Sequence, residues 1–202
     1  MINLVNLRKI SIPDSIEEIL GKFSSEYLEY STYQGLKYLG NSESPYLILC
    51  CAIDDSVTTV VTHPNTKVVL QGAFNGNANI ESVTLNDGLI TIGMSAFGGT
   101  SIKTIVIPNS VKKVSIAFVS CTMLESVVIG SEVTFIESST FLSCTSLTTV
   151  TILGKVKEIE NAAFDGCSSI TDVYFAGTAE EWDNIEIGFF NGYFTSATIH
   201  YI

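Results

Sequence analysis

Hydrophobic positions recur along most of this chain with a period of about 23 residues. Each period carries one Phe, usually preceded by Ala, and successive Phe residues are 23, 21, 23 and 23 positions apart. These residues are Phe74, Phe97, Phe118, Phe141 and Phe164. Self-similarity at a fixed period of this length is the signature of stacked repeats. The pattern therefore predicts a solenoid rather than a set of unrelated elements.

Further aliphatic residues follow each Phe at regular distances. The last two members of each group are two positions apart, so they point to the same side of a short strand. One period cannot bury its own apolar face, so neighbouring strands must stack into a parallel sheet. The groups are Ile80/Val83/Leu85, Ile102/Ile105/Ile107, Leu124/Val127/Ile129, Leu147/Val150/Ile152 and Ile170/Val173/Phe175. A second aliphatic pair, such as Val133/Ile136 or Val156/Ile159, precedes the next Phe and closes the coil.

The combined pattern A-F-x-x-C-x-x-L-x-x-V-x-I-P-x-S-V-x-x-I resembles the BspA-like leucine-rich repeat. Residues 102–114 match it most closely, and residues 7–19 give the same half-period. The resemblance covers nearly the whole chain. It implies an α/β leucine-rich-repeat solenoid of mainly short parallel strands with little helix.

The chain is expected to form a single leucine-rich-repeat domain over residues 1–202, with departures from a uniform array. A turn between 36–39 and 46–49 predicts a β-hairpin insertion. The period that ends at Phe118 is two residues short, which allows a slight kink. The predicted parts are a half-repeat at 1–19, the insertion at 20–66, repeats at 67–175 and a C-terminal cap at 176–202.

The last segment predicts a terminal cap. Thr178 and Glu181 have the spacing of a capping box at a helix start. Apolar residues from Trp182 to Tyr201 would then cover the open edge of the sheet, which otherwise invites aggregation. The chain begins inside a half-period, so we expect either a fragment of a longer array or an imperfect first edge.

The charge of the chain limits the kinds of partner that it can bind. The net charge is −11, only ten residues are Lys or Arg, and these are scattered. Nucleic acid and anionic membranes both require clustered basic residues and are therefore disfavoured. The longest apolar stretch, 46–53, is too short for membrane insertion. The chain shows no export signal, which predicts a cytoplasmic protein if it is complete as given.

Three cysteines, Cys121, Cys144 and Cys167, occupy one position of successive repeats. A line of three thiols does not close the tetrahedron that zinc prefers, so we expect a structural core column. The repeat spacing would allow one pair to form a disulfide. Cys50 and Cys51 are expected to be two strand residues, one pointing inward and one outward. Five free thiols favour a reducing compartment or an anaerobic habitat.

Catalytic constellations are missing from the sequence. His63 and His200 lie far apart, and no nucleophile motif accompanies them. The acidic residues Glu180, Glu181, Asp183 and Glu186 lack calcium-loop spacing and are expected to form a solvated helix face. We therefore predict a non-enzymatic protein with no cofactor and no metal.

The outward residues of each strand are the candidate site. They are small, polar to mildly apolar and nearly uncharged, and are expected on the concave side of the sheet. An unoccupied sheet face and a binding strip for protein or glycan explain this composition equally well. The candidate partner-binding residues are Thr84, Val106, Val128, Thr151 and Tyr174; Ser11 holds the same position, and a second row comprises Ser82, Thr104, Ser126, Thr149 and Asp172.

The resemblance to BspA-like proteins also implies a function for this strip. BspA-like proteins are associated with adhesion to host or extracellular-matrix proteins, often at bacterial surfaces, which implies a secreted or cell-surface binding module. An intracellular scaffold with the same fold is the alternative, and an unrecognised enzyme is a remote one. The ligand, the organism and the oligomeric state are not predicted.

Overall fold

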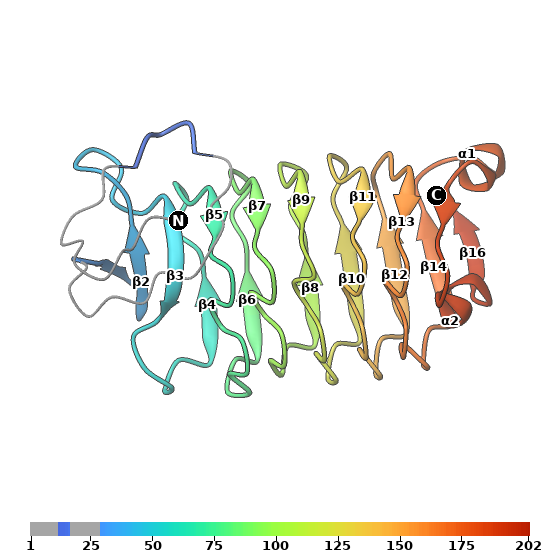
Figure 1. The fold of residues 1–202 in the computed structure, drawn as a ribbon, viewed down its shortest axis with the longest axis horizontal. Helices are drawn as coiled ribbons and strands as arrows, with labels where there is room; N and C mark the ends of the chain where they lie inside the picture. The colour runs from blue at the N-terminus through green and yellow to red at the C-terminus, as the bar shows by residue number, and fades with distance from the viewer. Residues whose placement is uncertain (1–11, 17–28) are drawn as a thin grey trace.

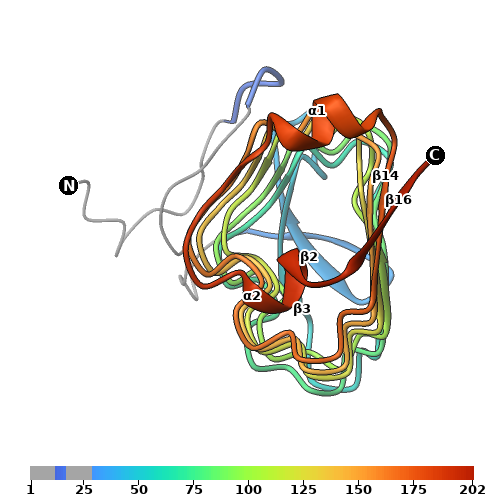
Figure 2. The same cartoon turned by 90° about the vertical axis from the view of Figure 1, so that its right-hand side faces the viewer.

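The structure is a computed structural model that describes residues 12–16 and 29–202. Coils stack along one axis, and most coils contribute one strand to each of two parallel sheets on opposite sides (Figure 1). Viewed along the stack, successive coils nearly superpose, so the face expected to be concave is close to flat (Figure 2). Ser11 and most of the half-repeat at 1–19 lie outside the described residues.

The first sheet contains the longer strand of each coil from β6 (Ser82–Thr84) onward. Its five-stranded part has the order β16-β14-β12-β10-β8, and β4 pairs with β6 in a separate parallel ladder. Adjacent strands are in register, so residues at the same repeat position lie side by side. The strands are β4 (Thr59–Val61), β6 (Ser82–Thr84), β8 (Thr104–Val106), β10 (Ser126–Ile129), β12 (Thr149–Ile152), β14 (Asp172–Phe175) and β16 (Thr198–Tyr201).

The second sheet is built from the aliphatic pairs that precede each Phe. It is divided into a parallel series β3-β5-β7-β9, extended by the antiparallel strands β2 and β1, and a parallel series β11-β13-β15. The strands are β1 (Ser31–Tyr33), β2 (Leu36–Leu39), β3 (Ile48–Ala52), β5 (Val68–Val69), β7 (Thr91–Ile92), β9 (Lys113–Val114), β11 (Phe135–Ile136), β13 (Glu158–Ile159) and β15 (Glu186–Ile187).

Both sheets are interrupted at the short coil between Phe97 and Phe118. The first sheet has no ladder between β6 and β8, and the second has none between β9 and β11, among the described strands. The stack stays continuous because β6 and β8 still lie in contact and the Ser101 N–H donates to the Ile80 carbonyl at 2.9 Å. The two missing residues therefore coincide with a break in both sheets, at the place where the sequence allowed a kink.

A column of stacked Phe rings forms the centre of the core. The rings of Phe74, Phe97, Phe118, Phe141 and Phe164 are buried, with neighbouring centroids 5.1 to 5.6 Å apart. Two backbone positions beside this column adopt positive φ in successive coils, which favours glycine. Glycine fills some of them, and Ser95, Ile116, Ser120, Ser139, Ser143 and Ala162 fill others.

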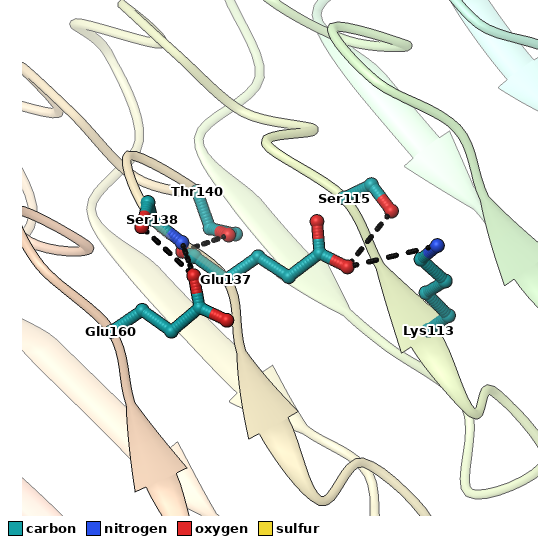
Figure 3. Close-up of polar contacts among 6 residues, drawn as sticks. All are labelled: Lys113, Ser115, Glu137, Ser138, Thr140 and Glu160. Atoms are coloured by element: carbon teal, nitrogen blue, oxygen red, sulfur yellow. Dashed lines mark hydrogen bonds and ion pairs between the residues drawn. The ribbon is translucent and has the colours of Figure 1, made fainter.

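Polar contacts between coils accompany the second sheet. The Glu160 carboxylate accepts hydrogen bonds from the Ser138 N–H at 3.0 Å and from its hydroxyl at 2.8 Å (Figure 3). One coil earlier, the Glu137 carboxylate accepts from the Ser115 hydroxyl at 3.3 Å and lies 3.9 Å from Lys113 Nζ. Carboxylates at equivalent positions of two successive repeats, Glu137 and Glu160, thus each join their coil to the preceding one on this side.

The region predicted as an insertion is divided between two kinds of structure. β2 and β3 pair antiparallel around residues 40–47, where the sequence predicted a hairpin. β4, however, pairs parallel with β6, with Val60 opposite Val83. The regular stack thus includes residues 59–61, which the predicted boundary at residue 66 had placed in the insertion.

The C-terminal segment forms a last, longer coil. It contains α1 (Ala179–Asp183), β15, α2 (Gly192–Thr195) and β16. Thr178 caps α1, with reciprocal contacts to Glu181 as predicted. Both β15 and β16 continue their parallel sheets. The segment was expected to cover the open edge, but β16 itself becomes the terminal strand of the first sheet.

Candidate partner-binding face

Two rows of outward side chains run across the first sheet, and together we call them the sheet face. They alternate with buried residues such as Val127 and Val150, because side chains of a strand point alternately to opposite sides. The first row is Thr59, Ser82, Thr104, Ser126, Thr149, Asp172 and Thr198; the second row is Val61, Thr84, Val106, Val128, Thr151, Tyr174 and His200.

The structure places four of the five predicted binding residues side by side on adjacent paired strands. Val106 pairs in register with Val128, Val128 with Thr151, and Thr151 with Tyr174. Thr84 lies on β6, next to β8 but outside this ladder. Val106 is the most exposed apolar residue of the group, with 61% of its surface accessible, whereas Val128, Thr151 and Tyr174 are half-buried.

Sequence reasoning missed both ends of the face. Thr59 and Val61 extend the rows on β4, and Thr198 and His200 extend them on β16. A signal existed for the first pair, because Val60 stands one period of 23 residues before Val83. The second pair follows Asp172 and Tyr174 by 26 residues, a spacing lengthened by the helices of the last coil.

The C-terminal end of the face carries its ionisable groups. His200 Nε2 lies 2.7 Å from Asp172 Oδ1, and the Thr171 hydroxyl donates to Asp172 Oδ2 at 2.7 Å. The hydrogen bond from His200, followed by that from Thr171, lowers the pKa of the Asp172 carboxyl. The His200 ring also stacks on Tyr174 with centroids 4.6 Å apart. This end is therefore aromatic and polar, while the middle of the face is uncharged.

The cysteine column is buried beside the Phe stack. Cys121, Cys144 and Cys167 each donate to a Phe carbonyl of the preceding coil, at 3.0, 3.2 and 3.0 Å. Contact with the thiols of Cys121 and Cys167, together with burial, raises the pKa of Cys144. A protonated, buried thiol such as that of Cys144 is a poor metal ligand and a poor nucleophile, whereas its hydrogen bond with Cys121 lowers the pKa of Cys121. Within the described residues, no group of three or more His, Cys, Asp or Glu side chains could hold a metal ion.

Two other surface features lie away from the sheet face. A groove of about 530 Å³ lies between β11, β13 and α1, where Lys155, Lys157, Glu158 and Glu186 surround the exposed ring of Phe135. It mixes both charges, and its lining residues include no Ser, Thr, Cys or His.

An aromatic cluster lies at the other end of the described stack. The half-exposed Tyr46 ring stacks on His63 at 4.1 Å, and the Tyr33 ring meets the edge of His63 at 4.9 Å. The buried Tyr38 ring packs edge-on against Tyr46, and burial raises the pKa of Tyr38 to about 12. The sequence gave no periodic signal for this cluster, because its members come from the hairpin and the turn after β4.

These features define a repeat solenoid with an open sheet face and a buried column of three cysteines. The family model for the BspA type leucine rich repeat region matches residues 50–191 in six copies. The chain belongs to this family, as the resemblance in its sequence indicated. No curated protein matches the sequence at a significant level. No helix in the described part of the chain is long and apolar enough to cross a membrane.

Solved structures with the same fold come from bacteria. A leucine rich cell surface protein from Faecalibacterium prausnitzii has a TM-score of 0.72 at 21% identity; the match covers 89% of this chain and 51% of that one. The T. pallidum leucine rich repeat protein has a TM-score of 0.62 at 20% identity, with 79% and 86% covered. The pneumococcal vaccine antigen PcpA has a TM-score of 0.57 at 16% identity, with 98% and 56% covered. The chain thus spans about half the length of the first of these proteins.

Proposed function

We propose that this chain is a non-enzymatic, adhesion-type binding module that uses its sheet face to bind another protein. The observation that carries the proposal is the register of Val106, Val128, Thr151 and Tyr174 across adjacent strands. Exposed apolar and aromatic side chains on a rigid, uncharged surface are typical of protein interfaces. Leucine-rich-repeat families generally serve as binding modules, and the similar proteins include a cell surface protein and a vaccine antigen.

The dimensions of the face limit the partner. Seven strands spaced roughly 4.8 Å apart span about 29 Å, and the two rows are about 7 Å apart along each strand. The face therefore offers on the order of 200 Å², whereas a stable interface buries about 800 Å² per partner. A partner must also contact the exposed loops beside the strands, where Lys103 and Glu125 lie. An elongated protein that runs along the stack meets this requirement better than a small glycan.

A matched pair of substitutions tests the proposal. Val106→Glu places a charge on the sheet face, at β8. Phe135→Glu places the same charge on β11, in the second sheet, and serves as the control. Partners are first captured from extracellular-matrix proteins and from cell lysate, and binding is then measured by surface plasmon resonance. We expect Val106→Glu, and the double change Val128→Glu with Thr151→Arg, to weaken binding at least tenfold. Unchanged binding by both variants would exclude the sheet face.

An intracellular scaffold is the second candidate, because the five cysteines Cys50, Cys51, Cys121, Cys144 and Cys167 are all unpaired in the structure. Free thiols are typical of reducing compartments. Fractionation of the native cells, with detection by an antibody against this chain, separates the two candidates. Recovery on the intact cell surface supports adhesion, and recovery only after lysis supports a scaffold.

A further inference from the structure

The groove of about 530 Å³ beside α1 shares no lining residue with the sheet face. Other repeats turn from the first sheet to the second through a short loop, such as residues 153–157, whereas residues 176–185 place α1 in this turn. Figure 2 shows α1 crossing the side of the coils where that turn is made. The helix lines the groove through Glu181 and Asn184, and no lining residue comes after Glu186. The groove therefore results from a helix inserted within the repeat array.

One accessible aromatic ring lies in this groove, next to two carboxylates. Phe135 on β11 has 47% of its surface exposed, whereas Val156 and Phe175, which also line the groove, are buried. Phe135 pairs in register with Glu158 on β13, and Glu158 pairs in register with Glu186 on β15. The three side chains therefore stand in one row across the sheet, with the ring at one end and the carboxylates beside it.

The charged groups of the groove are not paired with one another. Glu158 and Glu186 stand on adjacent strands, and like charges at directly opposed positions destabilise a sheet. Lys155 and Lys157 line the same groove. In the described part of the chain, no ion pair or side-chain hydrogen bond involves any of these four residues. The groove thus offers two carboxylates as hydrogen-bond acceptors and two ammonium groups as donors to a ligand.

From this arrangement we propose that the groove binds a short neutral oligosaccharide, with one sugar ring stacked on Phe135. The C–H face of a pyranose is apolar and flat enough to pack on an aromatic ring. Each sugar hydroxyl both donates and accepts hydrogen bonds, so a site that presents carboxylates and ammonium groups together satisfies it. The volume of the groove lies within the range of about 300 to 1,000 Å³ that is typical of small-molecule sites.

The balance of charge favours a neutral sugar over other ligands. The Glu181 carboxylate accepts hydrogen bonds from Thr178 in the capping box, which leaves two carboxylates and two lysines for a ligand. An anionic ligand would be repelled by the carboxylates, and a cationic one by the lysines. A purely apolar ligand would remove these charges from water without pairing them. A peptide strand finds no free edge on β13, because that strand is paired on both sides.

A glycan array followed by isothermal titration calorimetry tests the proposal. The array carries neutral oligosaccharides of glucose, galactose, mannose and N-acetylglucosamine, together with sialylated and sulfated ones. We expect a neutral oligosaccharide to bind, with an affinity that varies little with salt because the ligand has no net charge to screen. Phe135→Ala deletes the stacking ring and should weaken this binding at least tenfold. Phe189→Ala is the matched control, because it removes an exposed Phe ring that does not line the groove.

A second variant separates ligand binding from stability. The double change Glu158→Gln with Glu186→Gln keeps the size of both side chains but removes both charges. It should weaken binding at least fivefold, because hydrogen bonds to an ionised acceptor are about twice as strong as neutral ones. Its urea midpoint should equal or exceed that of the wild type, because the repulsion between the carboxylates is removed. Carboxylates that served only the fold would give the reverse: a lower midpoint and unchanged binding.

Several results would overturn the proposal. These are no binding of any neutral oligosaccharide, tighter binding of a sialylated or sulfated one, equal losses in Phe135→Ala and Phe189→Ala, or a marked salt dependence. The proposal does not rest on the sheet face and can fail separately from it. Enzymatic deglycosylation of the protein captured by the sheet face keeps the two tests apart, because Phe135→Glu, the control in that test, also alters this groove.

Discussion

Truncation of one ring in the Phe column should destabilise the whole solenoid. Phe141 is 1% exposed and is stacked between Phe118 and Phe164, at centroid distances of 5.4 and 5.1 Å. Replacing a buried Phe with Ala costs about 3 to 5 kcal/mol. Two stacked neighbours place Phe141→Ala near the upper end of that range, because each aromatic pair contributes about 0.5 to 1.5 kcal/mol beyond burial. Against a total stability of about 5 to 15 kcal/mol, this loss is large.

Phe135→Ala is the matched control for this substitution. Phe135 lies six positions earlier, on β11, and is 47% exposed. Full burial of a Phe side chain contributes about 1.5 to 3 kcal/mol, so a half-exposed one should contribute about 1 kcal/mol. The two variants thus delete the same atoms from neighbouring segments. They should differ by about 3 kcal/mol in the free energy of unfolding.

Urea unfolding measures this difference. Far-ultraviolet circular dichroism follows the sheets, and the fluorescence of Trp182, the one Trp in the sequence, follows the last coil. With an m-value of about 2 kcal/mol/M, Phe141→Ala should lower the midpoint by about 2 M. Coincident transitions of the two probes would show that the coils unfold together. A loss below about 1.5 kcal/mol, or one equal to that of Phe135→Ala, would refute a column whose rings support one another.

Three further predictions concern backbone geometry and pH. Ser120→Gly should stabilise the chain by about 0.5 to 1 kcal/mol in the same urea assay, because Ser120 is exposed at φ 58° and Gly99 stands at the equivalent position. Gly130→Ala should destabilise it by more than about 2 kcal/mol, because a Cβ there would meet the Pro108 carbonyl oxygen at 2.5 Å; an unchanged midpoint would contradict the close approach of the coils. Finally, the lowered pKa of Asp172 contributes stability that is present above the unfolded pKa of about 3.9 and is lost as pH falls through the folded value. Thermal unfolding at a series of acidic pH values should show a shallower decline for Asp172→Asn than for the wild type.

The repeat was predictable from the sequence because the residues that point into the core recur at a fixed interval. Val127 and Val150 lie one period apart in the sequence and pair in register in the structure. Every coil needs the same apolar residues at the same places, so the pattern predicts the strands, their parallel order and their register together. The residues that alternate with these apolar residues on each strand must then point outward. The sequence therefore also predicted that Val106 and Thr151 lie on the outer surface of the sheet.

The ends were harder to predict because their coils depart from the period. Phe194 continues the ring column, 4.4 Å from Phe164, although it follows that residue by 30 positions. The helices α1 and α2 lengthen this coil, so an interval of 23 does not find Phe194. The positive φ of Ile116 could not be predicted from the sequence either, because β-branched residues rarely adopt positive φ. Its conformation follows from its place in the coil rather than from its own preference.

If the proposed function holds, the functional information lies in outward residues that depart from the repeat. Inward positions are constrained by stacking and would be similar in any member of the fold. Outward positions carry no such constraint, so Ser and Thr suffice there. Exposed Val106 and aromatic Tyr174 exceed what the sheet requires. We therefore propose that Val106 and Tyr174 contact a protein bound to the sheet face.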